Sequence, residues 1–129
     1  MTKAILLSIQ PRHLRNILSG KKVFELRKRF PKDYIGWVYL YCTKANHIGF
    51  LSKQYPGKVV ARAWIDNVIV AEDEIAMQAG LTKEEFDSYS NGSKVCALHI
   101  AKVEIFDIFK EVTEYAKRPP QSWCYIWNI

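Results

Sequence analysis

Cysteine is scarce in this chain of 129 residues, and its three copies, Cys42, Cys96 and Cys124, stand far apart. An odd number without CxxC spacing argues against both a disulfide framework and a structural zinc site, and it favours a reducing compartment. A chain of this length buries roughly two thirds of its unfolded surface on folding, so its core needs neither disulfides nor metal. We therefore expect a cytoplasmic protein with no metal site and no cofactor.

Long apolar runs and linkers are missing as well. The apolar stretch near the N-terminus, residues 4–9, is too short for a signal peptide or a membrane span. No repeat, low-complexity tract or linker rich in proline, glycine and serine divides the chain. We predict that residues 1–129 form one domain that does not enter a membrane. We expect a monomer, while a homodimer and protein partners stay open.

The common catalytic and nucleotide-binding motifs are absent too. The chain has no GxSxG, HExxH or GxGxxG and no glycine-rich phosphate loop. Its histidines, His13, His47 and His99, are too scattered to pair by spacing, and we interpret each as a surface or strand residue. The sequence therefore leaves open whether this protein is an enzyme.

Acidic residues are rare in the first half of the chain. Up to Arg62 there are 13 Lys and Arg against two acids, a net charge of +11; the remainder has 6 Lys and Arg against 11 acids, a net charge of −5. The net charge of the whole chain is +6. This asymmetry predicts an electropositive face suited to phosphate-bearing ligands, unless the two halves interleave in space.

The hydrophobic pattern predicts an α+β fold of about six strands. The expected strands are residues 4–9, 22–27, 37–43, 58–70 and 95–105, with a final aromatic strand beginning near Trp123. Pro11 starts a short helix that Gly20 ends, and a helical insert occupies residues 72–90. Short strands without regular βα alternation favour a closed or nearly closed sheet over a doubly wound parallel fold.

The insert contains a turn at Gly80 that resembles the turn of a helix-turn-helix. Its second helix, however, carries acidic residues where a DNA-reading helix needs donors: Glu84, Glu85 and Asp87 stand against Lys83. Thr82 and Glu85 form a capping-box pattern at its start. We predict a solvated acidic helix pair and not a DNA-reading motif.

The segment 19–29 concentrates charged chemistry. A lone carboxylate, Glu25, stands among five cations, which are Lys21, Lys22, Arg27, Lys28 and Arg29. Strand alternation places Val23, Glu25 and Arg27 on one face, and Lys22 joins them only if the chain twists after Gly20. The residues alone leave two interpretations open: Glu25 is a structural ion-pair partner, or it holds cations toward an anionic ligand.

Gly20-x-Lys22-x-x-Glu25-x-Arg27, directly after a short helix, resembles the GxKxxExR signature of ASCH domains in the PUA-like superfamily. Further segments look like the same family in the same order: the Leu-Leu-Ser-Ile strand end, the strand after Gly36, the acidic insert, and Pro119-Pro120-Gln121-Ser122-Trp123. The resemblance covers nearly the whole chain. It implies a small PUA-like mixed β-barrel whose motif residues line a cleft beside the first helix.

The resemblance also implies roles related to RNA. Some ASCH proteins deacylate modified cytidine nucleosides, some are nucleases on single-stranded RNA, and others only bind nucleic acid. In the amidohydrolase branch a threonine nucleophile stands at the position of Glu25, which cannot be an alcohol nucleophile. The lysine of that branch matches Lys22, so this residue transfers by position while the deacylase mechanism does not.

We predict an RNA- or nucleotide-binding domain with a basic cleft. Its expected ligand-binding residues are Lys22, Glu25, Arg27, Lys21, Trp37 and Trp123. The two tryptophans start strands near turns, where one ring face is free for a nucleobase. Pairing with Glu25 would keep Lys22 an ammonium that binds phosphate, whereas crowding by other cations would favour a base; we favour the ammonium.

Two other hypotheses remain. The alternative function is a small hydrolase acting on single-stranded RNA or N-acylated cytidine nucleosides, with Lys22, Glu25 and Ser122 as the catalytic residues. Ser8 and Thr43 are further polar groups that end strands near this segment, and Ser122 has an equally good interpretation as a turn residue. A protein-interaction module would instead show a large apolar patch and no cleft.

Overall fold

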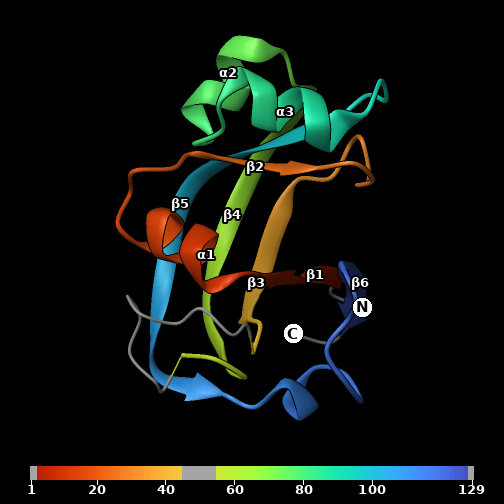
Figure 1. The fold of residues 1–129 in the computed structure, drawn as a ribbon. Helices are drawn as coiled ribbons and strands as arrows, with labels where there is room; N and C mark the ends of the chain where they lie inside the picture. The colour runs from red at the N-terminus through yellow and green to blue at the C-terminus, as the bar shows by residue number, and fades with distance from the viewer. Residues whose placement is uncertain (1–2, 45–54, 128–129) are drawn as a thin grey trace.

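The computed structural model describes residues 3–44 and 55–127 (Figure 1). Its elements follow the order β1 (Lys3–Ile9), α1 (Pro11–Leu18), β2 (Phe24–Arg27), β3 (Gly36–Cys42), β4 (Val59–Val70), α2 (Asp73–Gln78), α3 (Lys83–Ser90), β5 (Cys96–Lys110), a 3₁₀ turn (Val112–Glu114) and β6 (Trp123–Trp127). Six strands, the early helix and the helical insert confirm the α+β prediction. No helix among the described residues is long and apolar enough to cross a membrane.

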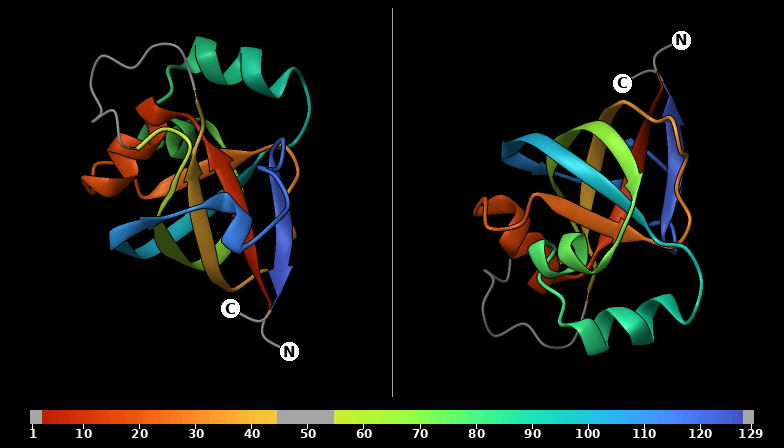
Figure 2. Two further views of the ribbon diagram at one scale, coloured as in Figure 1. Left: turned by 90° about the horizontal axis from the view of Figure 1, so that it is seen from below. Right: turned by 90° about the horizontal axis from the view of Figure 1, so that it is seen from above.

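The strands form one mixed sheet in the order β2-β5-β4-β3-β1-β6. The β1–β3 pair is parallel, and the other neighbouring strands are antiparallel. The sheet curls into a half-barrel (Figure 2), with register shifts along the long β4–β5 pair. Among the described residues, β2 and β6 are the sheet edges, so the barrel is not closed by backbone pairing.

Strand alternation separates the inside of the half-barrel from its outside. Along β3, Val38, Leu40 and Cys42 belong to the main core, together with Leu14 and Ile17 of α1. The intervening side chains of β3 face outward, where they pack in a second cluster with Phe106 and Tyr115. Because β1 follows the same alternation, the two parallel strands form the centre of the core.

The turn after α1 decides where the motif residues stand. Gly20 has a φ of +80°, a left-handed conformation that glycine adopts without steric cost. The Lys22 N–H then donates to the Asn16 carbonyl at 3.0 Å, which keeps Lys22 at the end of α1 and outside the sheet. The sequence predicted a strand that starts at residue 22. The strand starts at Phe24 instead.

The alternation predicted for β2 is confirmed. Glu25 pairs with Leu98 of β5, a residue of the main core, so its side chain faces the inside of the half-barrel. Leu26 faces the other way and packs under the insert with Ala76 and Phe86. A carboxylate thus occupies a position whose neighbours along the sheet are apolar.

The insert covers the outer side of β2, opposite α1 (Figure 1). Thr82 caps α3: its hydroxyl accepts from the Glu85 N–H, and the Glu85 carboxylate accepts from the Thr82 N–H. This confirms the predicted capping box. Phe86 is the buried residue of α3, and the acidic side chains of the helix remain toward solvent, so the insert is a covering element with no basic face.

β5 continues to Lys110, five residues beyond the predicted end of that strand. Its length follows from pairing with β4, because the ladder runs from Cys96 opposite Val70 to Lys110 opposite Val59. The alternation in the sequence predicted an end at Ile105. Hydrogen bonding to a long neighbour outweighs the local side-chain pattern here.

Candidate functional site

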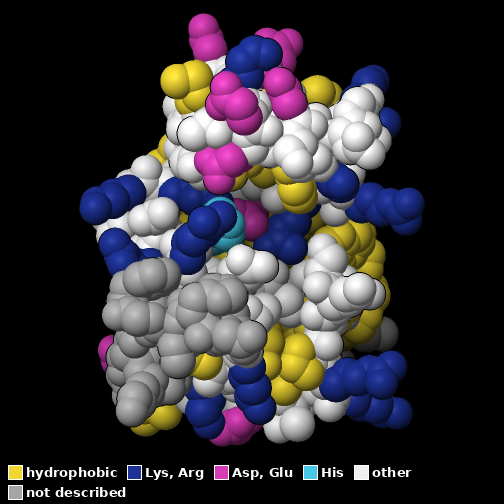
Figure 3. All heavy atoms as spheres, viewed as in Figure 1, with side chains coloured by type: hydrophobic (Ala, Val, Ile, Leu, Met, Phe, Trp, Pro, Cys, Tyr) yellow, Lys and Arg dark blue, Asp and Glu magenta, His cyan; other side chains and the backbone are white. Residues whose placement is uncertain are grey.

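A cleft of about 930 Å³ opens between α1, β2 and the insert. α1 contributes Arg12 and His13, and the segment around β2 contributes Lys22, Glu25, Leu26 and Arg27. The insert forms the opposite wall with Ala79, Leu81, Glu84, Glu85, Ser88 and Tyr89, and Ser8, Gln10, Thr43 and Gln121 complete the lining. Figure 3 shows a histidine and mixed charges around this hollow, with carboxylates gathered over the insert above it.

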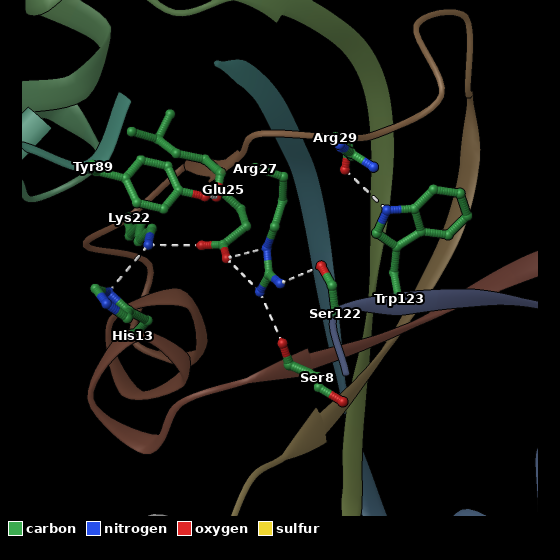
Figure 4. A network of polar contacts seen from close by, with 10 residues as sticks. Ser8, His13, Lys22, Glu25, Arg27, Arg29, Tyr89, Ser122 and Trp123 are labelled. Atoms are coloured by element: carbon green, nitrogen blue, oxygen red, sulfur yellow. Dashed lines mark hydrogen bonds and ion pairs between the residues drawn. The ribbon is translucent and has the colours of Figure 1, made fainter. Parts of the chain in front are cut away.

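Glu25 is the centre of a charged network at the floor of the cleft (Figure 4). Its Oε1 lies 2.7 Å from the Lys22 ammonium. Its Oε2 accepts from Arg27 Nε at 3.0 Å and from Arg27 Nη2 at 2.8 Å. One carboxylate therefore neutralises one of two cations and leaves the network with a surplus of one positive charge.

This network is buried. Within the described part of the chain, the buried polar or charged residues are Ser8, Lys22 and Glu25, at 7%, 6% and 5% exposure. Removing charges from water is costly, and a buried ion pair is retained only with close partners. A charged cluster of this kind is weak evidence for stability and better evidence for a site.

The Glu25 carboxyl stays ionised despite its burial. Burial raises the pKa of Glu25, but the Lys22 ammonium and the Arg27 guanidinium lower it by more, so the resulting pKa lies below the ordinary value. Glu25 is therefore an anion at neutral pH, which makes it an acceptor and a poor acid.

Arg27 connects the edges of the half-barrel. Its Nη2 donates to the Ser8 carbonyl of β1 at 2.8 Å, and its Nη1 donates to Ser122 Oγ, just before β6, at 3.3 Å. The Ser8 hydroxyl in turn donates to the Pro120 carbonyl at 2.6 Å. Side chains thus join β2 to β1 and β6 where backbone pairing does not.

Comparison with known proteins bears on the fold. No protein-family model matches the sequence, and no curated protein gives a significant match. Among solved structures, the ASCH protein of Zymomonas mobilis (ZmASCH) superposes with a TM-score of 0.74 at 18% identity, over 96% of this chain and 87% of that one. The chain has the ASCH-domain fold. Two ZmASCH variants each give a TM-score of 0.75. The tyrosine-to-phenylalanine variant is 18% identical over 98% of this chain and 91% of its own. The serine-to-alanine variant is 17% identical over 96% of this chain and 88% of its own.

The structure brings the three charged residues of the ASCH-like motif, Lys22, Glu25 and Arg27, into one cluster. Ser122 also reaches it, as the acceptor of the Arg27 hydrogen bond. Accepting this bond does not activate the serine, because a nucleophilic hydroxyl needs a base that takes its proton. Ser8 and Thr43 line the cleft as well.

The other predicted ligand residues lie elsewhere. Lys21 is exposed and does not line the cleft. Trp37 faces the outside of the half-barrel, where the Arg62 guanidinium lies 3.8 Å from its ring centre. Trp123 packs against Phe30, with ring centres 5.6 Å apart, and its indole N–H donates to the Arg29 carbonyl at 2.9 Å.

His13 was interpreted from the sequence as a surface residue, and the structure instead places it in the cleft. Its Nδ1 lies 3.4 Å from the Lys22 ammonium. Burial and the Lys22 charge lower the pKa of His13, so the ring is neutral at pH 7 and Nδ1 accepts from Lys22. Of the other histidines, His99 of β5 lies 2.7 Å from the Asp66 carboxylate, and His47 is outside the described residues.

The predicted basic cleft is mixed in charge in this ASCH fold. Its lining contains three cations, Arg12, Lys22 and Arg27, and three carboxylates, Glu25, Glu84 and Glu85. The reason is that α3 brings the acidic second half of the chain against the basic first half, so the two halves interleave. Among the described residues, no group of three His, Cys, Asp or Glu side chains is placed to hold a metal ion.

Removing Glu25 alone should cost far more than removing Glu25 and Lys22 together. We expect Glu25→Gln alone to lower the free energy of unfolding by about 3–5 kcal/mol, because it leaves the buried Lys22 ammonium without a carboxylate partner. Lys22→Met alone should cost less than that, because Glu25 keeps its two hydrogen bonds from Arg27. The double variant should lose clearly less than the sum. Urea unfolding of the four proteins measures the coupling.

The exposed Lys83–Asp87 pair, at 3.4 Å, is the matched control. Its double-mutant cycle should give less than about 1 kcal/mol, because solvent screens exposed charges. Additive losses at Lys22 and Glu25 would contradict the buried coupling.

The lowered pKa of His13 predicts an acid-sensitive step in stability. The unfolded chain binds this proton near pH 6.5, whereas the folded chain binds it only at lower pH. The contribution is therefore complete above about pH 6.5 and is lost as the pH falls toward the folded pKa. Glu25 adds a further loss only at more acidic pH, below its ordinary range.

His13→Gln isolates this step, because glutamine keeps an acceptor but does not titrate. Between about pH 7.5 and pH 5.5, the urea midpoint of the unaltered chain should fall more than that of the variant. Equal falls would mean that His13 is not linked to folding.

Proposed function

We propose that this chain is an ASCH domain that binds one nucleotide unit of single-stranded RNA in the cleft. The observation that carries the proposal is the buried Lys22–Glu25–Arg27 network at the cleft floor. Its surplus positive charge sits in a poorly solvated place, where attraction to an anion is stronger than at an exposed surface. A phosphate group is the anion that RNA offers.

The donors of the network also support an anionic ligand. A lysine ammonium has three N–H groups and an arginine guanidinium has five. Within the described residues, two N–H groups of Lys22 are used by contacts to Glu25 and His13. Four N–H groups of Arg27 are used by hydrogen bonds to Glu25, Ser8 and Ser122. One donor of Lys22 and one of Arg27 therefore remain for a ligand, on neighbouring side chains.

The opposite wall suits a nucleobase. Tyr89 and Leu81 of the insert give it aromatic and apolar surface, which Leu26 of β2 adjoins, and the Lys28 ammonium lies 5.2 Å from the Tyr89 ring centre. Bases of single-stranded RNA stack on aromatic rings and expose their hydrogen-bonding edges. Glu84 in the same wall is an acceptor of the kind that pairs with an exocyclic amino group, such as that of cytosine.

The balance of charges favours one nucleotide over a long stretch of polyanion inside the cleft. Three carboxylates among its lining residues would repel a run of phosphates, whereas a single phosphate needs only the floor and Arg12. We propose that the rest of the RNA lies outside. The expected setting remains cytoplasmic, with the chain acting as a monomer.

Binding to RNA should be sensitive to salt and to the floor of the cleft. We expect Arg12→Gln to lower the slope of log K against log salt by about 0.7, because one phosphate contact to a single strand is lost. The Lys22→Met, Glu25→Gln double variant should bind at least tenfold more weakly, because it loses the charged donor of Lys22 without leaving the buried Lys22 ammonium unpaired, while Arg27 keeps its bonds to Ser8 and Ser122. Fluorescence anisotropy with a labelled hexacytidylate over a salt series measures both.

Lys102→Gln is the control, because Lys102 is an exposed cation beside Trp37 on the outside of the half-barrel. It should change neither the affinity nor the slope beyond a small non-specific effect. RNA binding that is absent, or that ignores both cleft variants, would refute the proposal.

A hydrolase is the second candidate, and one observation favours it. Lys22 is a buried ammonium held between the His13 ring and the Glu25 carboxylate, a placement suited to stabilising an oxyanion. Glu25 would position Lys22 and assist proton transfer, with Ser122 in contact through Arg27. The substrates proposed are phosphodiesters of single-stranded RNA or N-acylated cytidine nucleosides.

Turnover assays with end-labelled RNA and with N-acetylcytidine decide between binding and hydrolysis. If the chain is a hydrolase, the Lys22→Met, Glu25→Gln double variant should lose about 100-fold or more in kcat, as expected for removal of an oxyanion donor. Ser122→Ala should have a comparable effect only if Ser122 is the nucleophile. Equal turnover in the double variant would show that the activity belongs elsewhere.

A further inference from the structure

β6 carries an aromatic stripe, defined here as Trp123, Tyr125 and Trp127. Alternate strand residues share a face, and the ring centres follow one another at 5.3 Å and 6.4 Å. Packing covers Trp123 in part, but Tyr125 is 39% and Trp127 is 53% exposed. Tyr125 pairs with Ile5 and Trp123 with Leu7, two residues of the main core, so the rings extend from the inner face of the sheet. Because β6 is a sheet edge, that face is open beside Tyr125 and Trp127.

The stripe starts beside the candidate site. Ser122, the residue before it, accepts a hydrogen bond from Arg27, and Figure 4 shows Ser122 and Trp123 next to each other on the β6 side of the network. From there β6 runs toward the chain termini (Figure 2). The cleft floor and the exposed rings are therefore consecutive along one path over the surface.

Cations flank the stripe. The Lys3 ammonium lies 4.4 Å from the ring centre of Tyr125 and 5.8 Å from that of Trp127. The Trp123 indole N–H donates to the Arg29 carbonyl, which places the exposed Arg29 beside the start of the stripe. Rings and cations together match a ligand that alternates flat bases with phosphates.

We propose that the aromatic stripe binds the bases of single-stranded RNA that continue out of the cleft. Stacking on Tyr125 and Trp127 supplies contacts that tolerate any base, and Lys3 contacts the backbone phosphates. The path of the strand rests on the proposed function, because it begins from the nucleotide in the cleft. A second copy of the chain is a poorer occupant, since a two-fold contact would bring the cations of both stripes together.

A matched pair of variants at Tyr125 tests the stripe. Tyr125→Phe keeps the ring, whereas Tyr125→Leu keeps an apolar side chain without it. We expect Tyr125→Leu to weaken hexacytidylate binding about fivefold to 100-fold and Tyr125→Phe to leave it unchanged. Binding of cytidine monophosphate should be the same in both, because one nucleotide does not leave the cleft.

Ile108→Ala is the control for a lost exposed apolar side chain, since Ile108 of β5 is 77% exposed. It should bind the hexanucleotide as the unaltered chain does. If Tyr125→Leu binds the hexanucleotide as tightly as the unaltered chain does, the proposal that the stripe binds RNA is overturned. Sedimentation showing a dimer that Tyr125→Leu dissociates overturns it too, because the rings would then belong to a contact between copies.

The two proposals fail in different ways. One outcome is that the Lys22→Met, Glu25→Gln double variant binds the hexanucleotide normally, while Tyr125→Leu does not bind it. The stripe then stands as an RNA-binding surface and the cleft proposal fails. If cytidine monophosphate binds in the cleft and added nucleotides bring no gain in affinity, the cleft proposal stands and the stripe is refuted.

Discussion

Burial of the Glu25 carboxylate is the constraint on which the site depends. Its position in β2 points it toward the inside of the half-barrel, opposite Leu98, where an ion without close partners would be too costly. Lys22 and Arg27 compensate it from opposite sides. Meeting that requirement needs the left-handed turn at Gly20, which holds Lys22 at the end of α1 with its ammonium against Glu25.

The same network closes the seam of the half-barrel. β2 and β6 share no backbone ladder in the described part of the chain, yet Arg27 reaches β1 and the start of β6, and Trp123 reaches the Arg29 carbonyl. Because polar side chains and not backbone hydrogen bonds join β2 to β6, space remains between these strands that direct backbone pairing would close. The cleft and the exposed rings of β6 both lie along this seam, which is why the proposed binding surface is continuous.

Local pattern was enough for the elements and for part of the site. Alternation in β2 predicted that Glu25 and Arg27 share a face, because successive side chains of a strand point to opposite faces of the sheet. The end of α1 and the capping box at Thr82 were equally local. The extent of β5 was not, because its second half is held by pairing with β4 and not by its own residues.

The sequence by itself indicated the fold class, through its strand and helix pattern, and placed Glu25 and Arg27 on one face of β2, since strand alternation is a local property. Lys22 joins them through the turn at Gly20. Tertiary structure decided the rest of the cleft. His13 faces Lys22 only because α1 packs beside β2, and α3 contributes its acidic wall only because the insert folds over that strand. Both depend on contacts between segments distant in sequence, which periodicity and charge counts do not encode.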